Sequence, residues 1–211
     1  MISIRRAASR VTALAAAMTI AIAAVPSGGA AASLLGGCPA STLERPFTRW
    51  LDLSRYVLMP NGGFESGTTG WTLSGGAATT ADNESYYVHG TSDTTSLALS
   101  SGSSATTSNV CVSATSPALR FFARNTGSPL STLKVEVLYR NIFDAPSTLT
   151  VATLVGTSSW QPTVPIAFLA NLMALPLVTD GTTNVAFRFI PQDSLSGWSI
   201  DDVYVDPFKG E

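Results

Sequence analysis

The feature that most constrains the fold is a strict alternation of apolar and polar side chains over residues 133–139. Val135 and Val137 fall on one face of an extended segment, and Lys134 and Glu136 fall on the other. A period of two residues is typical of a strand that packs one face against a hydrophobic core. This segment therefore predicts a half-buried β-strand.

Short apolar runs separated by turn residues continue along the chain from Asn61 onward. Residues 166–178 are nearly all apolar, and we expect a buried strand with a turn or a short core helix there. No segment has the pattern and caps of a long amphipathic helix, and no fixed-period repeat is present. About eight to ten short strands in one domain predict an all-β fold, a two-sheet antiparallel jelly-roll sandwich. The other predicted strands are residues 71–73, 86–88, 97–99, 119–123, 149–155, 185–189 and 200–205.

The N-terminus has the pattern of an export signal. Three arginines precede an apolar stretch at residues 11–25, and Ala30 and Ala32 form an A-x-A cleavage site. The stretch is short for a membrane span, although an uncleaved anchor is the alternative. We therefore expect a secreted or cell-envelope protein. The predicted organisation is a signal peptide at 1–32, an irregular N-terminal wrap at 33–59 and a β-sandwich domain at 60–211.

The chain has two cysteines, Cys38 and Cys111. Two cysteines in an exported chain predict one disulfide. The alternative is a lipid anchor, because residues 35–38 loosely resemble a bacterial lipobox. Cys38 lies well beyond the apolar stretch, however, whereas a lipobox normally adjoins it. The pattern favours the disulfide.

Charge and composition exclude several classes of function. All fourteen acidic residues but only nine of the twelve basic ones follow residue 32, which leaves a net charge near −5. Nucleic-acid binding needs clustered Lys and Arg, which this chain lacks. His89 is the only histidine and no G-x-S-x-G motif is present, so catalysis is not expected. A zinc site built from several His or Cys ligands is not expected either.

Two motifs lie at opposite ends of the predicted sandwich. Residues 61–65 read N-G-G-F-E and are followed by Gly70-Trp71, and residues 197–203 read G-W-S-I-D-D-V. Together they resemble the opening and closing strands of the galactose-binding-like jelly-roll superfamily, especially its calcium-containing carbohydrate-binding modules. The resemblance covers residues 60–206. It implies the same sandwich and a structural calcium ion away from the sugar site.

The resemblance also implies calcium ligands. Its first and last strands lie close together, which would bring Glu65 near Asp201 and Asp202. Carboxylates held together repel one another unless a cation neutralises them, and calcium prefers oxygen ligands. Ile200 and Val203 both look like core residues, so a bulge between them would break the alternation. The alternative is that these acids are solvated or bond backbone amides.

Sugar recognition has a weaker signal. Trp71, Trp160 and Trp198 are expected to pack inside the fold, because large aromatic side chains are usually mostly buried. The fourth, Trp50, lies in the predicted wrap.

The candidate ligand-binding residues are Tyr86, Tyr87 and His89. In a strand, one of two adjacent tyrosines must point outward. The sequence thus favours an exported non-catalytic module that binds carbohydrate. The alternative is a structural or adhesive envelope protein that binds protein partners, and the fold alone does not decide between them.

Overall fold

The computed structural model of the 211-residue chain describes residues 38, 41–113, 117–168 and 182–206. The chain divides into two compact units, Met1–Ala31 and Ala32–Glu211, and all described residues belong to the second. The predicted signal peptide at 1–32 lies outside the described residues. Within the described part, no helix combines the length and the apolar character that crossing a membrane requires.

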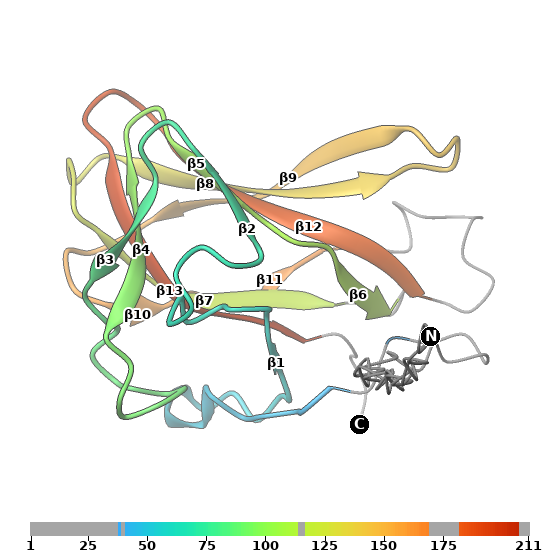
Figure 1. Ribbon diagram of the computed structural model, residues 1–211, viewed down its shortest axis with the longest axis horizontal. Helices are drawn as coiled ribbons and strands as arrows, with labels where there is room; N and C mark the ends of the chain where they lie inside the picture. The colour runs from blue at the N-terminus through green and yellow to red at the C-terminus, as the bar shows by residue number, and fades with distance from the viewer. Residues whose placement is uncertain (1–37, 39–40, 114–116, 169–181, 207–211) are drawn as a thin grey trace, which may run out of the picture. The chain divides into compact units, whose positions relative to one another are not determined.

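The second unit is a sandwich of two antiparallel sheets (Figure 1), which confirms the predicted fold class. The seven-stranded sheet has the order β10-β7-β13-β4-β3, with β1 paired to β13 and β11 paired to β7. The six-stranded sheet has the order β2-β5-β12-β8-β9, with β6 paired to β12. The strands are β1 Val57–Leu58, β2 Trp71–Ser74, β3 Ala78–Ala81, β4 Thr95–Ser100, β5 Ser104–Thr107, β6 Val110–Ser113, β7 Ala118–Asn125, β8 Thr132–Arg140, β9 Pro146–Val155, β10 Gln161–Pro162, β11 Ile166–Ala167, β12 Thr182–Pro191 and β13 Gly197–Asp206.

The alternating segment at residues 133–139 lies in strand β8 and has one buried face, as predicted. Val135 and Val137 are fully buried in the core between the sheets. On the outward face, Glu136 accepts hydrogen bonds from the Nε of Arg188 at 2.8 Å and forms an ion pair with the Nζ of Lys134 at 2.8 Å. Burial acts to raise the pKa of Glu136, but the hydrogen bonds from these two cations outweigh it and lower the pKa. The outward face of this sheet is therefore polar around Glu136.

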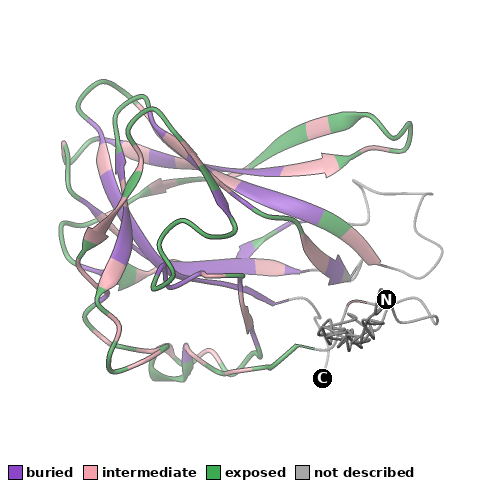
Figure 2. Ribbon diagram, in the orientation of Figure 1, coloured by how far each residue is buried: buried purple, intermediate pink, exposed green. Residues whose placement is uncertain are grey.

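The main core fills the space between the sheets, where Figure 2 shows buried residues concentrated along β7, β12 and β13. The tryptophans predicted to pack are buried: Trp71 is 8%, Trp160 5% and Trp198 1% exposed. Fully burying a large apolar side chain contributes roughly 1.5–3 kcal/mol. The predicted packing is confirmed.

A second apolar cluster covers the outward face of the seven-stranded sheet. Phe47 and Tyr56, from the segment before the first strands, pack with Phe122, Trp160 and Tyr204. The ring of Phe47 stacks on Phe122 with centroids 5.7 Å apart. This segment contains one short 3₁₀ helix, η1 (Thr48–Trp50), and a bridge between Glu44 and Tyr56.

Buried Arg120 fixes this segment in place. Its guanidinium is ion-paired with Asp52, donates from Nε to the carbonyl of Thr163 at 2.8 Å and lies over the ring of Phe47. Burial acts to raise the pKa of Asp52, but hydrogen bonds from Tyr56 and Ser54 and the charge of Arg120 outweigh it and lower the pKa. One outward face of the sandwich is therefore occupied by the chain itself.

Two parts of the strand prediction need correction. Residues 86–88 lie in a turn, because the backbone N–H groups of Tyr86 and Val88 bond the carboxylate of Glu84 and not a neighbouring strand. Strands β3 and β5 were not predicted, because their sequences are rich in Ser and Thr. Strand β6 was not predicted because its alternation of Val110 and Val112 spans only four residues. Of the apolar segment at 166–178, Ile166–Ala167 is a strand and residues 169–181 lie outside the described part of the chain.

Candidate functional site

The two sequence motifs meet at a bulge in β13. The N–H of Met59 donates to the carbonyl of Val203 at 2.9 Å, and the N–H of Val203 donates to the carbonyl of Gly62 at 3.1 Å. The pairing of β13 with β7 shifts register between Asp201 and Tyr204. Asp202 has φ 46°, a left-handed conformation that a bulge tolerates. The expected bulge is present. Because of it, the side chains of Asp201 and Asp202 do not alternate between the two faces of the sheet as they would in a regular strand.

Asp201 anchors the loop that follows β3. Its Oδ2 accepts the backbone N–H of Glu84 at 2.9 Å, and its Oδ1 accepts the N–H of Asp202 at 2.8 Å. Glu84 in turn accepts the N–H groups of Tyr86 at 2.6 Å and Val88 at 2.7 Å. Both acids are fully buried. The loop is thus held by carboxylate-to-amide hydrogen bonds in place of a strand ladder.

These buried acids have shifted pKa values. Burial raises the pKa of Asp201 to about 9, with the charge of Asp202 adding to the effect. Burial likewise raises the pKa of Asp202 to about 7, with a further contribution from Glu84. Burial also raises the pKa of Glu84, and its backbone donors offset this only in part. Burial therefore favours the protonated, neutral form of these acids.

His89, Asp93 and Asp202 form a group that could hold a metal ion. One ligand atom from each lies within 4.8 Å of the other two. The Nδ1 of His89 is 2.6 Å from the Oδ2 of Asp93. A Cβ at Gly63 would come 3.0 Å from the Oδ1 of Asp202 and 3.3 Å from the Nδ1 of His89. A side chain at Gly63 would therefore crowd this group.

The predicted calcium ligand Glu65 has other partners. Its Oε1 accepts the backbone N–H groups of Thr94 at 2.9 Å and Thr95 at 2.7 Å, and the residue is exposed. Among the described residues, Glu65 does not join Asp201 and Asp202 in a three-ligand group. The group that does form includes an imidazole nitrogen, whereas calcium takes oxygen ligands. The donor set therefore does not match calcium.

Tyr86 and Tyr87 do not form one aromatic surface. Tyr86 packs edge-on against Trp50 with centroids 4.9 Å apart, and its hydroxyl reaches the carbonyl of Trp160 at 3.4 Å. Tyr87 is 48% exposed and has φ 53°. His89 turns toward Asp93. Of the three predicted ligand-binding residues, Tyr87 and His89 are exposed, whereas Tyr86 is half-buried.

An open groove of about 660 Å³ lies on the other sheet and includes residues of β5, β8, β9 and β12. Leu138 and Ala186 are registered partners that alternate with the core residues Val137 and Phe187, so they line the groove from the outward face. Its polar lining is rich in hydroxyl and amide groups. These polar residues include Thr106, Asn109, Arg140, Thr182, Thr183 and Asn184.

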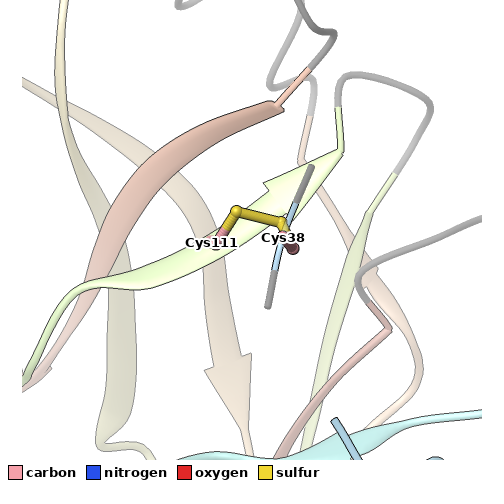
Figure 3. Close-up of a disulfide and its surroundings, with 2 residues drawn as sticks. All are labelled: Cys38 and Cys111. Atoms are coloured by element: carbon pink, nitrogen blue, oxygen red, sulfur yellow. A yellow bond between two sulfur atoms is a disulfide. The ribbon is translucent and has the colours of Figure 1, made fainter. Parts of the chain in front are cut away.

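The disulfide joins Cys38 to Cys111 on β6 (Figure 3), as the sequence predicted. The two residues are 73 positions apart, with Cα atoms separated by 5.3 Å. No described cysteine is free. The bond ties the N-terminal segment to the six-stranded sheet, and it engages the sulfur that a lipid anchor at Cys38 would modify.

Comparison with known proteins supports the architecture. No protein-family model and no curated protein sequence matches the chain. One similar structure contains the family 22 carbohydrate-binding and GH10 modules of endo-1,4-β-D-xylanase 10B from Clostridium thermocellum, solved with xylohexaose. It matches with a TM-score of 0.51 at 17% identity, over 71% of this chain and 28% of that one. A tandem of two family 22 modules from Paenibacillus barcinonensis Xyn10C matches with a TM-score of 0.50 at 16% identity, over 74% of this chain and 46% of that one. The chain has the jelly-roll fold of carbohydrate-binding modules. Its matching part spans less than half of either of those chains.

The groove and the roles of two acids near the β13 bulge, Asp93 and Glu84, were not predicted from the sequence. Asp93 follows His89 by four residues, a spacing that could have suggested a contact across a tight loop. Glu84 gave no signal, because its partners are backbone amides. The groove combines residues of four strands whose outward faces read as ordinary polar surface.

Proposed function

We propose that this chain is a non-catalytic carbohydrate-binding module whose sugar site is the groove on the six-stranded sheet. The observation that carries the proposal is the lining of the groove. Hydroxyl, amide and guanidinium groups line the groove together with the apolar side chains of Leu138 and Ala186. Sugars present hydroxyl groups around apolar C–H faces, so a groove with both kinds of contact suits them.

The arrangement of the two outward faces supports this location. The face of the seven-stranded sheet is covered by the cluster of Phe47 and Tyr56, and buried Arg120 holds that cover in place. The groove lies on the opposite sheet, and Asn184 beside it is exposed. The fold shared with family 22 modules is a further support, and the xylohexaose bound to the Clostridium enzyme makes that oligosaccharide the first probe.

Substitutions in the groove test the site. Losing one hydrogen-bonding side chain typically costs about 0.5–1.5 kcal/mol, so Asn184→Ala should weaken glycan binding roughly two- to twelvefold. The double variant Asn109→Ala with Asn184→Ala should weaken it by more than about tenfold. Affinity electrophoresis in gels containing soluble polysaccharides measures both effects.

Tyr87→Ala is the matched control for this experiment. Its ring is exposed but lies outside the groove, so glycan affinity should stay at the wild-type value. Loss of affinity in Tyr87→Ala with no change in the groove variants would move the site to the loop of Tyr86, Tyr87 and His89.

The second candidate function is adhesion to a protein partner through β9. This ten-residue strand ends the six-stranded sheet, carries no charged side chain and has no partner on its outer edge among the described strands. Uncharged edge strands can accept a strand from another chain. Adhesion that Thr150→Lys abolishes, in a protein that binds no glycan, would favour this function.

A further inference from the structure

We propose that His89, Asp93 and Asp202 bind a divalent transition-metal ion, with zinc the best match, in place of the calcium that the fold family implies. The three residues come from two distant parts of the chain. His89 and Asp93 lie in the loop between β3 and β4, and Asp202 lies in the bulge of β13. One imidazole nitrogen and two carboxylate oxygens lie within 4.8 Å of one another.

The donor atoms distinguish between metals. Zinc accepts nitrogen from histidine and oxygen from carboxylates, and three protein ligands with a water molecule complete a tetrahedral site. Calcium requires six to eight oxygen ligands. Glu65, the further acid that a calcium site would use, bonds the backbone of Thr94 and Thr95. A zinc site was not expected from the sequence, because the chain has one histidine. In the fold, however, two aspartates lie beside that histidine.

The buried acids around the site also favour a bound metal ion. Asp201, Asp202 and Glu84 are each at most 2% exposed. Among the ion pairs of the described residues, only His89–Asp93 reaches this cluster, and no Lys or Arg does. Buried charges are normally paired or coordinate a metal. A bound dication would stabilise the ionised form of these buried carboxylates.

The surrounding residues hold the ligands in position. The carboxylate of Asp201 accepts the N–H of Glu84, and the carboxylate of Glu84 accepts the N–H of Val88, the residue before His89. The loop that carries the imidazole is thus fastened to the strand that carries Asp202. Such supporting hydrogen bonds are a regular feature of metal sites.

An ion would have access to the site. Glycine at position 63 keeps a side chain from crowding the Nδ1 of His89 and the Oδ1 of Asp202. The side chain of His89 is 34% exposed, whereas that of Asp93 is 10% exposed. An ion can therefore enter from the His89 side. Metal binding here is separate from glycan binding, because the groove lies on the other sheet.

Calorimetric titration of the chelator-treated protein with Zn²⁺ alone tests the proposal. We expect one Zn²⁺ per chain, and His89→Asn and Asp93→Asn should each weaken binding by more than the roughly 10–100-fold that loss of a supporting residue costs. The readout is specific, because the chain has no other histidine and no described free cysteine. Substitution with Co²⁺ adds a visible absorption band that should disappear in His89→Asn.

Two further variants keep the test decisive. Gly63→Ala leaves all three ligands in place but puts a Cβ 3.0 Å from the Oδ1 of Asp202, so zinc binding should weaken. Asp144→Asn removes an exposed carboxylate on the β8–β9 hairpin and should change nothing. The proposal fails if Zn²⁺ does not bind stoichiometrically or if His89→Asn binds it like the wild type. It also fails if Ca²⁺ binds more tightly than Zn²⁺ and His89→Asn leaves that affinity unchanged.

Discussion

Removing the disulfide between Cys38 and Cys111 is expected to lower the free energy of unfolding by about 4 kcal/mol. The bond closes a loop of 73 residues, and an open chain gains that loop's conformational freedom when it unfolds. Urea unfolding of the wild type and of the double variant Cys38→Ala with Cys111→Ala measures the difference. The variant should unfold at a lower urea concentration.

Thiol titration provides the control. The denatured, unreduced protein should contain no reactive thiol, because both cysteines are in the disulfide. Two reactive thiols per chain would contradict the bond. An unchanged unfolding free energy in the double variant would show that the N-terminal segment is held without it.

Replacing Arg120 with alanine is expected to lower the free energy of unfolding by about 3 kcal/mol, because removing one partner of a buried ion pair leaves the other uncompensated. Asp52 would lose its cation, and the carbonyl of Thr163 would lose its donor. The ring of Phe47 would also lose the guanidinium packed over it. Thermal or urea unfolding followed by tryptophan fluorescence measures the change.

Arg140→Ala is the matched control for Arg120→Ala. Its ion pair with Asp144 is exposed, with side chains 63% and 72% accessible, so its loss should cost less than about 1 kcal/mol. Equal destabilisation by the two substitutions would contradict the role assigned to burial. A selective loss at Arg120 would show that the N-terminal segment is an integral part of the fold.

The sandwich was predictable because its main strands have one buried face. The alternation over residues 133–139 and the apolar runs of β7, β12 and β13 reflect a single core between two sheets. The disulfide followed from cysteine count and export pattern alone. Strands β3 and β5 escaped prediction, because Ser and Thr in strands look like turn residues when no periodic apolar face accompanies them. Strand β6 escaped prediction because its alternation of Val110 and Val112 spans only four residues.

The candidate sites were less predictable, because they depend on loops and on contacts between distant residues. The two motifs correctly indicated that the two ends of the domain lie close together, as the hydrogen bond between Val203 and Gly62 shows. The bulge at Asp202 followed from two core residues with an incompatible spacing. The partners of Glu65 could not be inferred, since they are backbone amides of a loop. Tyr86 was expected near the surface, but its ring packs against Trp50 from the N-terminal segment.

The most direct test of the central claim is calorimetric titration of the purified protein with xylohexaose, followed by soluble polysaccharides of other backbone types. The account predicts saturable binding of at least one neutral glycan, little changed by salt and weakened in Asn184→Ala. The absence of binding to every glycan tested, in a folded protein, would contradict the assignment of the groove as a sugar site.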